Sequence, residues 1–139
     1  MPQTPTPVLD DSDTGGFWQA AQRGALAVQW CWRCAQPVHL PRPQCPRCGS
    51  SELGWHDVDG TATVYSWAVV RHPVHPAFPV PYTVALVALT DHPSVRLMAH
   101  FDGTPPLREG LPVRCVARPD AAGVLVPQWE LVTDDRSMT

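Results

Sequence analysis

The sequence contains no lysine, no isoleucine and no asparagine, so arginine alone supplies its 10 positive charges. The 13 acidic residues leave a formal net charge of −3 at pH 7. Proteins that bind nucleic acids normally carry clustered Lys and Arg side chains that neutralise phosphates. The missing lysine and the scattered arginines therefore argue against a nucleic-acid-binding protein.

The sequence also lacks the segments that membrane insertion and secretion require. No apolar run reaches the roughly 18–20 residues that cross a bilayer. The first seven residues contain neither the basic residues nor the hydrophobic stretch of a signal peptide. We therefore expect a cytoplasmic protein that does not insert into a membrane.

Proline, by contrast, is abundant, with 17 residues beside 9 glycines. Proline breaks helix interiors and is poorly tolerated in central strands. This content excludes a helical bundle and places the prolines in loops and at sheet edges. Hydrophobic residues make up 44% of the chain and six residues are tryptophan, which argues against disorder. The composition indicates a mainly β domain stiffened by proline.

One segment, residues 14–25, favours a short helix. Asp13 or Thr14 is placed to cap its start, and Gly24 is placed to end it in a left-handed conformation. Residues 1–13 are rich in Pro, Thr and Asp, and we expect them to form a flexible tail. A second flexible tail is expected over residues 133–139.

Strand signals recur after residue 58. They cover residues 61–71, 82–90, 95–101, 113–118 and 124–131. Five strands separated by turn residues predict a small closed or partly open barrel over residues 58–132. Alternation along the first strand favours core positions for Tyr65 and Trp67. The same face could instead stack nucleic-acid bases, as it does in some barrels.

Four of the five cysteines form two closely spaced pairs within residues 26–57, namely Cys31 with Cys34 and Cys45 with Cys48. A two-residue spacer lets both thiolates of a pair reach one ion, and two such turns complete a tetrahedron. Gly49 supplies the backbone freedom that the second turn needs. Four sulfurs leave no open coordination position, so the pattern predicts a structural zinc ion. Iron in the same tetrahedron and disulfide or redox pairing are the alternatives.

Other candidates for chemistry carry weaker signals. Cys115 lies within an alternating strand, where we expect a buried and inert thiol. The sequence has no Gly-x-Ser-x-Gly elbow and no His-Glu-x-x-His motif. His72 and His75 lie on a loop broken by prolines, so a second metal site there is disfavoured. No self-sufficient catalytic group emerges, and a hydrolase that uses His75 is a minor alternative.

Several motifs, taken in order, resemble one protein family. They are Phe17–Ala21, Pro41–Ser50, Gly60–Trp67, His75–Phe78, Pro81–Val87 and Gly110–Val113. Their order and spacing over residues 15–131 are similar to the acyl-CoA-associated family known as domain of unknown function thirty-five. The resemblance implies a short N-terminal helix, a rubredoxin-like zinc ribbon over residues 26–57 and a C-terminal five-stranded OB-fold barrel.

The resemblance also implies a function. Members of this family accompany thiolase-superfamily enzymes and help to form their acyl-CoA pockets, in thiolysis, acyl transfer or the retro-aldol cleavage of steroid side chains. We therefore expect an accessory subunit of such a complex in lipid or steroid metabolism, with structural Zn²⁺ as its cofactor. A single-stranded nucleic-acid-binding module is the alternative. Contacts with the partner or with acyl-CoA are expected at Arg42, Arg71, His72, His75, Phe78 and Tyr82.

Overall fold

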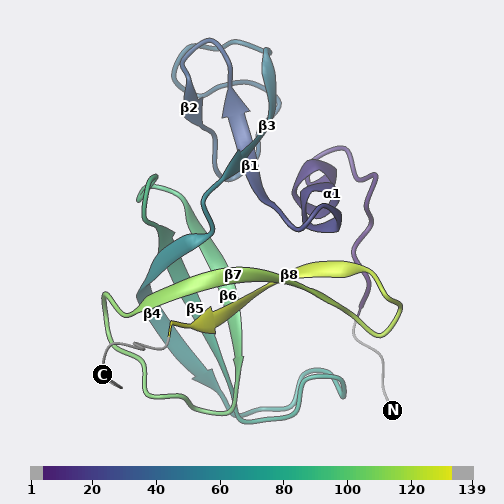
Figure 1. Ribbon diagram of the computed structural model, residues 1–139, viewed down its shortest axis with the longest axis vertical. Helices are drawn as coiled ribbons and strands as arrows, with labels where there is room; N and C mark the ends of the chain where they lie inside the picture. Colours follow the sequence, from purple (N-terminus) through teal and green to yellow (C-terminus); the bar gives the residue numbers. More distant parts are fainter. Residues whose placement is uncertain (1–4, 133–139) are drawn as a thin grey trace, which may run out of the picture.

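The structure, a computed structural model, describes residues 5–132 and contains one short helix and two antiparallel sheets (Figure 1). The mainly β fold class predicted from the sequence is confirmed. The tail predicted over residues 133–139 lies outside the described residues, as do residues 1–4 of the other tail. Near the start of the described residues, the Thr6 hydroxyl donates to Asp120 (3.1 Å), in the turn of residues 120–124. No helix in the described part of the chain is long and apolar enough to span a membrane.

Helix α1 (Gly15–Gln22) ends as the sequence predicts. Gly24 adopts φ 76°, and its N–H donates to the Ala21 carbonyl while the N–H of Ala25 donates to Ala20 (3.0 and 2.9 Å). These two bonds form the left-handed termination that glycine favours. Thr14, one of the two predicted residues, occupies the N-cap position, but its side chain makes no capping hydrogen bond. The carboxylate of Asp11 holds the turn before the helix. It accepts from the backbone N–H groups of residues 13 and 14.

The three strands of the first sheet form the ribbon. They are β1 (Leu26–Cys31), β2 (Gln36–Pro37) and β3 (Leu53–Val58), in the order β2-β1-β3. The sequence did not predict β3 as a separate strand, because Gly54 and the mixed polarity of its residues hide the alternation. Its register comes from β1, along which it pairs from Leu26 opposite Val58 to Cys31 opposite Leu53.

The second sheet forms the barrel, with five strands in the order β6-β5-β4-β7-β8. The strands are β4 (Thr61–Val70), β5 (Tyr82–Leu89), β6 (Arg96–Asp102), β7 (Pro112–Pro119) and β8 (Leu125–Leu131). Strands β6 and β8 are the two edges of the sheet and pack against each other. The prediction of a five-stranded, partly open barrel is therefore confirmed.

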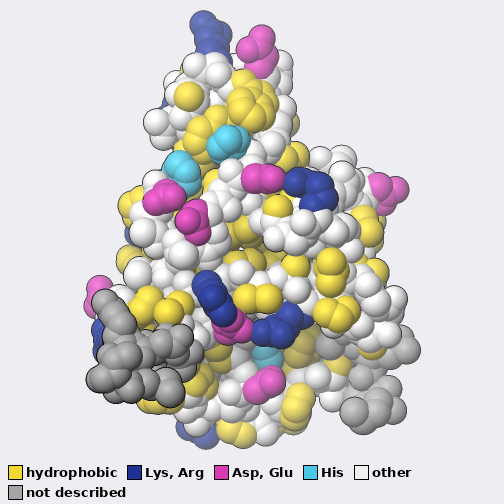
Figure 2. Space-filling model, viewed as in Figure 1, with side chains coloured by type: hydrophobic (Ala, Val, Ile, Leu, Met, Phe, Trp, Pro, Cys, Tyr) yellow, Lys and Arg dark blue, Asp and Glu magenta, His cyan; other side chains and the backbone are white. Residues whose placement is uncertain are grey.

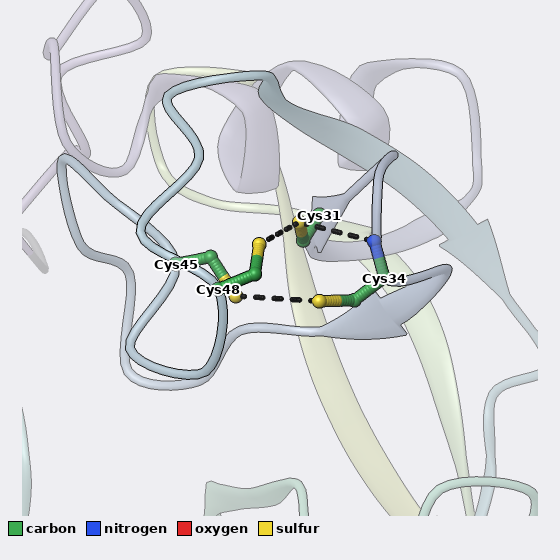
Figure 3. A group of neighbouring side chains, drawn as sticks. All are labelled: Cys31, Cys34, Cys45 and Cys48. Atoms are coloured by element: carbon green, nitrogen blue, oxygen red, sulfur yellow. Dashed lines mark hydrogen bonds between the residues drawn. The ribbon is translucent and has the colours of Figure 1, made fainter.

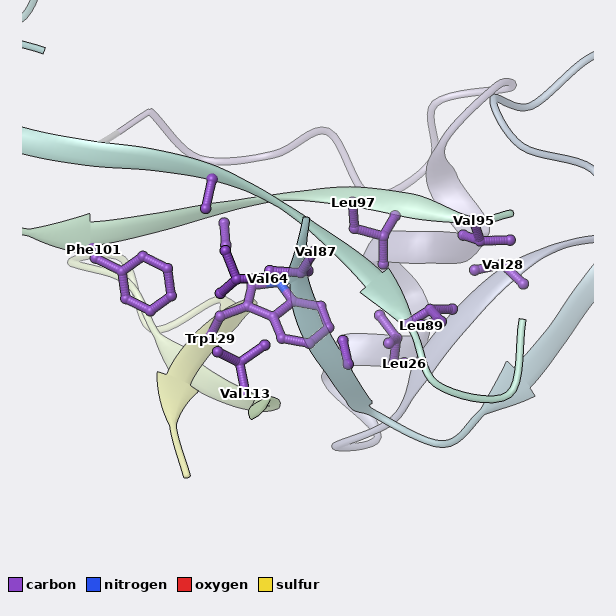
Figure 4. Packing of buried hydrophobic residues seen from close by; sticks show 13 residues of the cluster. Leu26, Val28, Val64, Val87, Leu89, Val95, Leu97, Phe101, Val113 and Trp129 are labelled. Atoms are coloured by element: carbon purple, nitrogen blue, oxygen red, sulfur yellow. The ribbon is translucent and has the colours of Figure 1, made fainter. Parts of the chain in front are cut away.

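Ribbon and barrel share one hydrophobic core (Figure 4). Leu26 and Val28 of β1 belong to the same buried cluster as Val64, Leu89 and Trp129 of the barrel. The first ribbon strand therefore links the cysteine turns at one end to the barrel core at the other. Damage to the ribbon is expected to reach the barrel through this strand.

The prediction that Tyr65 and Trp67 belong to the core is wrong. Their exposed fractions are 44% and 43%. The register of β4 against β5 shifts between Val64 and Ser66, which marks a β-bulge at Tyr65. A bulge inserts one residue and breaks the period-two alternation on which the prediction depended.

Candidate functional site

Figure 3 shows that the two cysteine pairs meet at the tip of the ribbon. Cys31 ends β1, Cys34 follows in the next turn, and Cys45 and Cys48 come from the turn before β3. All four sulfurs lie within 4.8 Å of one another. Among residues 5–132 this is the one group of three or more His, Cys, Asp or Glu side chains with the spacing of a metal site.

The distances between the sulfurs fit a tetrahedral ion. The Cys31 and Cys48 sulfurs are 3.7 Å apart, and those of Cys34 and Cys45 are 3.9 Å apart. A metal–sulfur distance of about 2.3 Å implies sulfur–sulfur separations of roughly 3.8 Å in a regular tetrahedron. A disulfide would need about 2.05 Å. The quartet therefore suits one metal ion, and the four thiols are unpaired in this structure.

Both cysteine turns have the same construction. The N–H of Ala35 donates to the Cys31 carbonyl, and the N–H of Gly49 donates to the Cys45 carbonyl, each at 2.8 Å. Ala35 has φ 55° and Gly49 has φ 75°. A left-handed residue thus closes each turn directly after its second cysteine. The role predicted for Gly49 is confirmed, and Ala35 takes the same conformation despite its Cβ.

The surroundings shift the pKa of Cys34 and that of Cys45 in opposite directions. Hydrogen bonding with Cys48, followed by burial and the other two sulfurs, raises the pKa of Cys34 to about 12. Burial disfavours the Cys45 thiolate, but the backbone amides of Cys48 and Arg47 more than offset it and lower the pKa of Cys45 to about 6. Metal ligands are thiolates, so metal binding at this quartet would release protons.

A second feature is a groove of about 620 Å³ between α1, the ribbon and the β5–β6 face of the barrel. Its walls are mostly apolar, and two arginines, Arg42 of the ribbon and Arg96 of β6, line it together. Leu40 and Met98 also line it, and their exposed fractions are 70% and 67%. The groove therefore combines exposed apolar surface with two positively charged side chains.

The side chain of Gln29 holds the backbone of Arg42, and an aromatic ring contacts the guanidinium of Arg96. Gln29 of β1 accepts from the N–H of Arg42 (2.8 Å) and donates to its carbonyl (2.9 Å). The Arg96 guanidinium lies 3.9 Å from the centre of the Tyr65 ring. His39 lines the same groove and stays apart from the cysteine quartet. Burial lowers its pKa, so its imidazole is neutral near pH 7.

The residues predicted to contact a partner or acyl-CoA do not form one group. Arg42 lies in the groove beside the ribbon, whereas the β4–β5 loop that holds most of the others lies at the opposite end of the barrel (Figure 1). Arg71 and His72 are exposed there. The N–H of Ala77 donates to His75 Nδ1 (3.0 Å), so that histidine stabilises the loop itself.

Phe78 and Tyr82 do come together, around a histidine that the sequence analysis missed. The His100 ring lies 5.5 Å from that of Phe78 and 5.0 Å from that of Tyr82. Arg96 and Met98, on the same strand as His100, were not predicted as site residues either. All three lie on the outward face of β6, which the alternation of residues 95–101 identifies but does not relate to the ribbon or the loop.

Comparison with known proteins agrees with the fold. A family model described as the C-terminal OB-fold domain of ChsH2 matches residues 55–118. A solved structure named "Ltp2-ChsH2(DUF35) aldolase" superposes with a TM-score of 0.80 at 34% identity, covering 92% of this chain and 100% of that chain.

Three curated relatives are also similar. A probable enoyl-CoA hydratase alpha subunit of Thermomonospora curvata is 40% identical over 111 residues, 78% of this chain and 34% of that protein. A 3-oxo-4,17-pregnadiene-20-carboxyl-CoA hydratase alpha subunit of Mycobacterium tuberculosis is 31% identical over 123 residues, 86% of this chain and 36% of that protein. A DUF35 domain-containing scaffold protein of Pyrococcus furiosus is 35% identical over 80 residues, 55% of this chain and 57% of that protein.

The chain thus spans about a third of the length of the two hydratase subunits. It covers the whole length of the chain that it matches in the aldolase structure. The cysteine quartet, the five-stranded barrel and this full-length match agree with one another. The chain therefore belongs to the DUF35 family.

Proposed function

We propose that this chain is an accessory subunit of a complex that acts on CoA thioesters. It docks a thiolase-superfamily enzyme and contributes the groove between α1, the ribbon and the barrel to the acyl-CoA site. The observation that carries the proposal is the meeting of Arg42 and Arg96 in one apolar groove. The names of the relatives, which are subunits, a scaffold and an aldolase complex, support it.

The chemistry of the groove matches that of an acyl-CoA. Guanidinium groups suit phosphate oxygens because they donate two parallel hydrogen bonds. Phe17, Leu40 and Met98 offer apolar contact to a pantetheine or acyl chain. Leu40 and Met98 are too exposed for an isolated subunit to seal a ligand from water. A partner surface that covers them would complete the site.

Carbon–carbon chemistry is assigned to the partner. Among the described residues that line the groove, no hydroxyl donates to His39, the one histidine there, and the Thr14 hydroxyl donates instead to Asp11 at the start of the helix (2.8 Å). The chain would instead bind and orient the thioester for thiolysis, acyl transfer or retro-aldol cleavage. Paired, unoxidised cysteines suit a reducing compartment, so we place the complex in the cytoplasm.

The ion at the quartet is proposed to be structural Zn²⁺, held by Cys31, Cys34, Cys45 and Cys48. Four thiolates form a closed site, and a bound zinc ion would fix the two turns to each other. Iron would fit the same tetrahedron. Elemental analysis and the visible absorption of iron–thiolate centres distinguish the two metals.

Co-expression tests the function directly. The chain would be expressed with the thiolase-superfamily protein encoded nearest to it, and the pair would be purified through a tag on one partner only. We expect co-elution and a loss of CoA-thioester turnover when this subunit is left out. Independent elution together with full activity of the enzyme alone would contradict the proposal.

The nucleic-acid alternative has one observation in its favour, the exposure of Tyr65 and Trp67 on an OB-fold strand. The charges oppose it. The face drawn in Figure 2 shows arginine side chains scattered among acidic ones rather than gathered along a path. Arg96 also covers one face of the Tyr65 ring, which leaves less of that ring open to a stacked base. The acyl-CoA proposal is therefore favoured.

A further inference from the structure

The two edge strands of the barrel meet in a seam that the groove does not include. Strands β6 and β8 pack together, but among the described residues no strand pairing by backbone hydrogen bonds joins them. Two hollows of about 290 and 390 Å³ open along this seam and share Phe78, His100, Gln128 and Trp129. Trp129 also belongs to the barrel core, so the seam leads from the surface to the core.

Aromatic rings frame the mouth of the seam. His100 of β6 lies between Tyr82, at the start of β5, and Phe78 of the β4–β5 loop, with centroid distances of 5.0 and 5.5 Å. Phe78 and Tyr82 are 6.3 Å apart. Prolines on both sides of Phe78 stiffen the loop, which lowers the entropy lost when the ring orders around a ligand.

His100 has one polar atom that the described residues leave unpaired. Its Nδ1 faces the almost fully exposed carboxylate of Asp102 at 3.9 Å. Its Nε2 is buried and makes no hydrogen bond with the described residues. A buried polar atom without a partner is costly and uncommon in folded proteins. In neutral imidazole one nitrogen donates and the other accepts, so a hydroxyl group can pair with Nε2 in either tautomer.

We propose that this seam binds a small, flat apolar molecule that carries a hydroxyl group, with the hydroxyl on His100 Nε2 and the ring against Phe78 and Tyr82. An apolar cavity of roughly 150 Å³ accommodates benzene. The hollow of about 290 Å³ beside Phe78 is therefore large enough for two fused rings. The inference does not rest on the acyl-CoA proposal, because Phe78, His100 and Gln128 lie outside the groove, although Met98 lines both the groove and this hollow.

Two matched probes test it on the whole chain. 2-Naphthol and 2-methylnaphthalene have the same rings, but only the first carries a hydroxyl group. Titrations followed by ¹H–¹⁵N NMR are expected to shift Phe78, His100 and Gln128, and to show roughly fivefold tighter binding of 2-naphthol, the effect of one hydrogen bond. The side-chain ¹⁵N resonance of His100 Nε2 is expected to move with 2-naphthol only.

Variants then separate the hydrogen bond from hydrophobic contact. His100→Phe keeps a ring and removes the nitrogen, so it is expected to abolish the preference for 2-naphthol. His39→Phe removes a histidine from the other groove and is expected to leave the preference unchanged. Equal affinity for the two probes, shifts confined to the groove, or a preference that survives His100→Phe would overturn the proposal. If His100→Phe does not fold, the ¹⁵N response of the unaltered chain decides.

Discussion

Gly16 of α1 lies directly against the indole ring of Trp55 in β3. A Cβ added at Gly16 would stand 2.1 Å from Cγ of Trp55. Trp55 and the helix residue Phe17 both line the groove with Arg42 and Arg96. The missing side chain at position 16 therefore lets the helix approach the ribbon and form one wall of the groove.

We predict that Gly16→Ala destabilises the chain by about 1–3 kcal/mol, the usual cost of forcing extra atoms into a packed contact. In an ordinary helix the same change stabilises by roughly 0.5–1 kcal/mol. A decrease in the free energy of unfolding would therefore identify the clash with Trp55. Urea unfolding measures it. In a Trp55→Ala background, Gly16→Ala should become neutral or stabilising. An equal loss in both backgrounds would mean that Trp55 is not the obstacle.

We predict that Cys45→Ser abolishes metal binding and lowers the melting temperature of the whole chain, because β1 carries both a ligand turn and part of the barrel core. Zinc contributes apparent folding free energies of roughly 10–16 kcal/mol in finger peptides. Metal content by mass spectrometry and thermal unfolding by circular dichroism provide the measurements. Cys115→Ser, which lies outside the quartet, is the matched control and should keep the metal.

We predict that Arg42→Ala and Arg96→Ala each weaken the binding of a CoA thioester to the assembled complex about tenfold, as expected for a lost charged hydrogen bond. Isothermal titration or the change in KM measures the effect. Arg33→Ala removes an exposed ribbon arginine that does not line the groove. A complex with Arg33→Ala should bind the CoA thioester as tightly as the unaltered complex. A similar loss of affinity with Arg33→Ala would mean that the overall positive charge, rather than the groove, determines binding.

We predict that Cys115 reacts slowly with iodoacetamide in the folded chain. Burial raises its pKa to about 11 from an ordinary 9.0. The thiolate is the reactive form, so at pH 8 its population falls roughly a hundredfold relative to an unperturbed thiol. The rate should rise about tenfold per pH unit until the pH nears 11. Peptide mapping by mass spectrometry follows this residue alone, and rapid labelling at pH 8 without denaturant would contradict the prediction.

We predict that the chain does not bind single-stranded DNA or RNA at physiological ionic strength. A net charge of −3 and the absence of lysine leave few groups to neutralise phosphates. Fluorescence anisotropy with labelled oligonucleotides tests this over a range of salt concentrations. A salt-dependent affinity that Trp67→Ala removes would revive the nucleic-acid alternative.

Features that depend on short stretches of chain could be predicted from the sequence. The spacing of the four cysteines, the left-handed residues Gly24 and Gly49, and the alternation along β6 each specify local backbone geometry. The family resemblance rests on the same kind of feature, because motifs are short and ordered. The fold class and the residues of the metal quartet follow from these local rules.

Tertiary structure decided everything that depends on contacts between distant residues. Arg42 and Arg96 share a groove only because β1, β3 and α1 bring the ribbon against the barrel. The bulge at Tyr65 depends on the register that β5 imposes on β4, so alternation alone mispredicted it. His100 matters only because β8 and the β4–β5 loop pack beside it. Local sequence determines backbone conformation within a few residues. Grooves and seams arise where distant elements pack together, and short stretches of sequence do not reveal which elements these are.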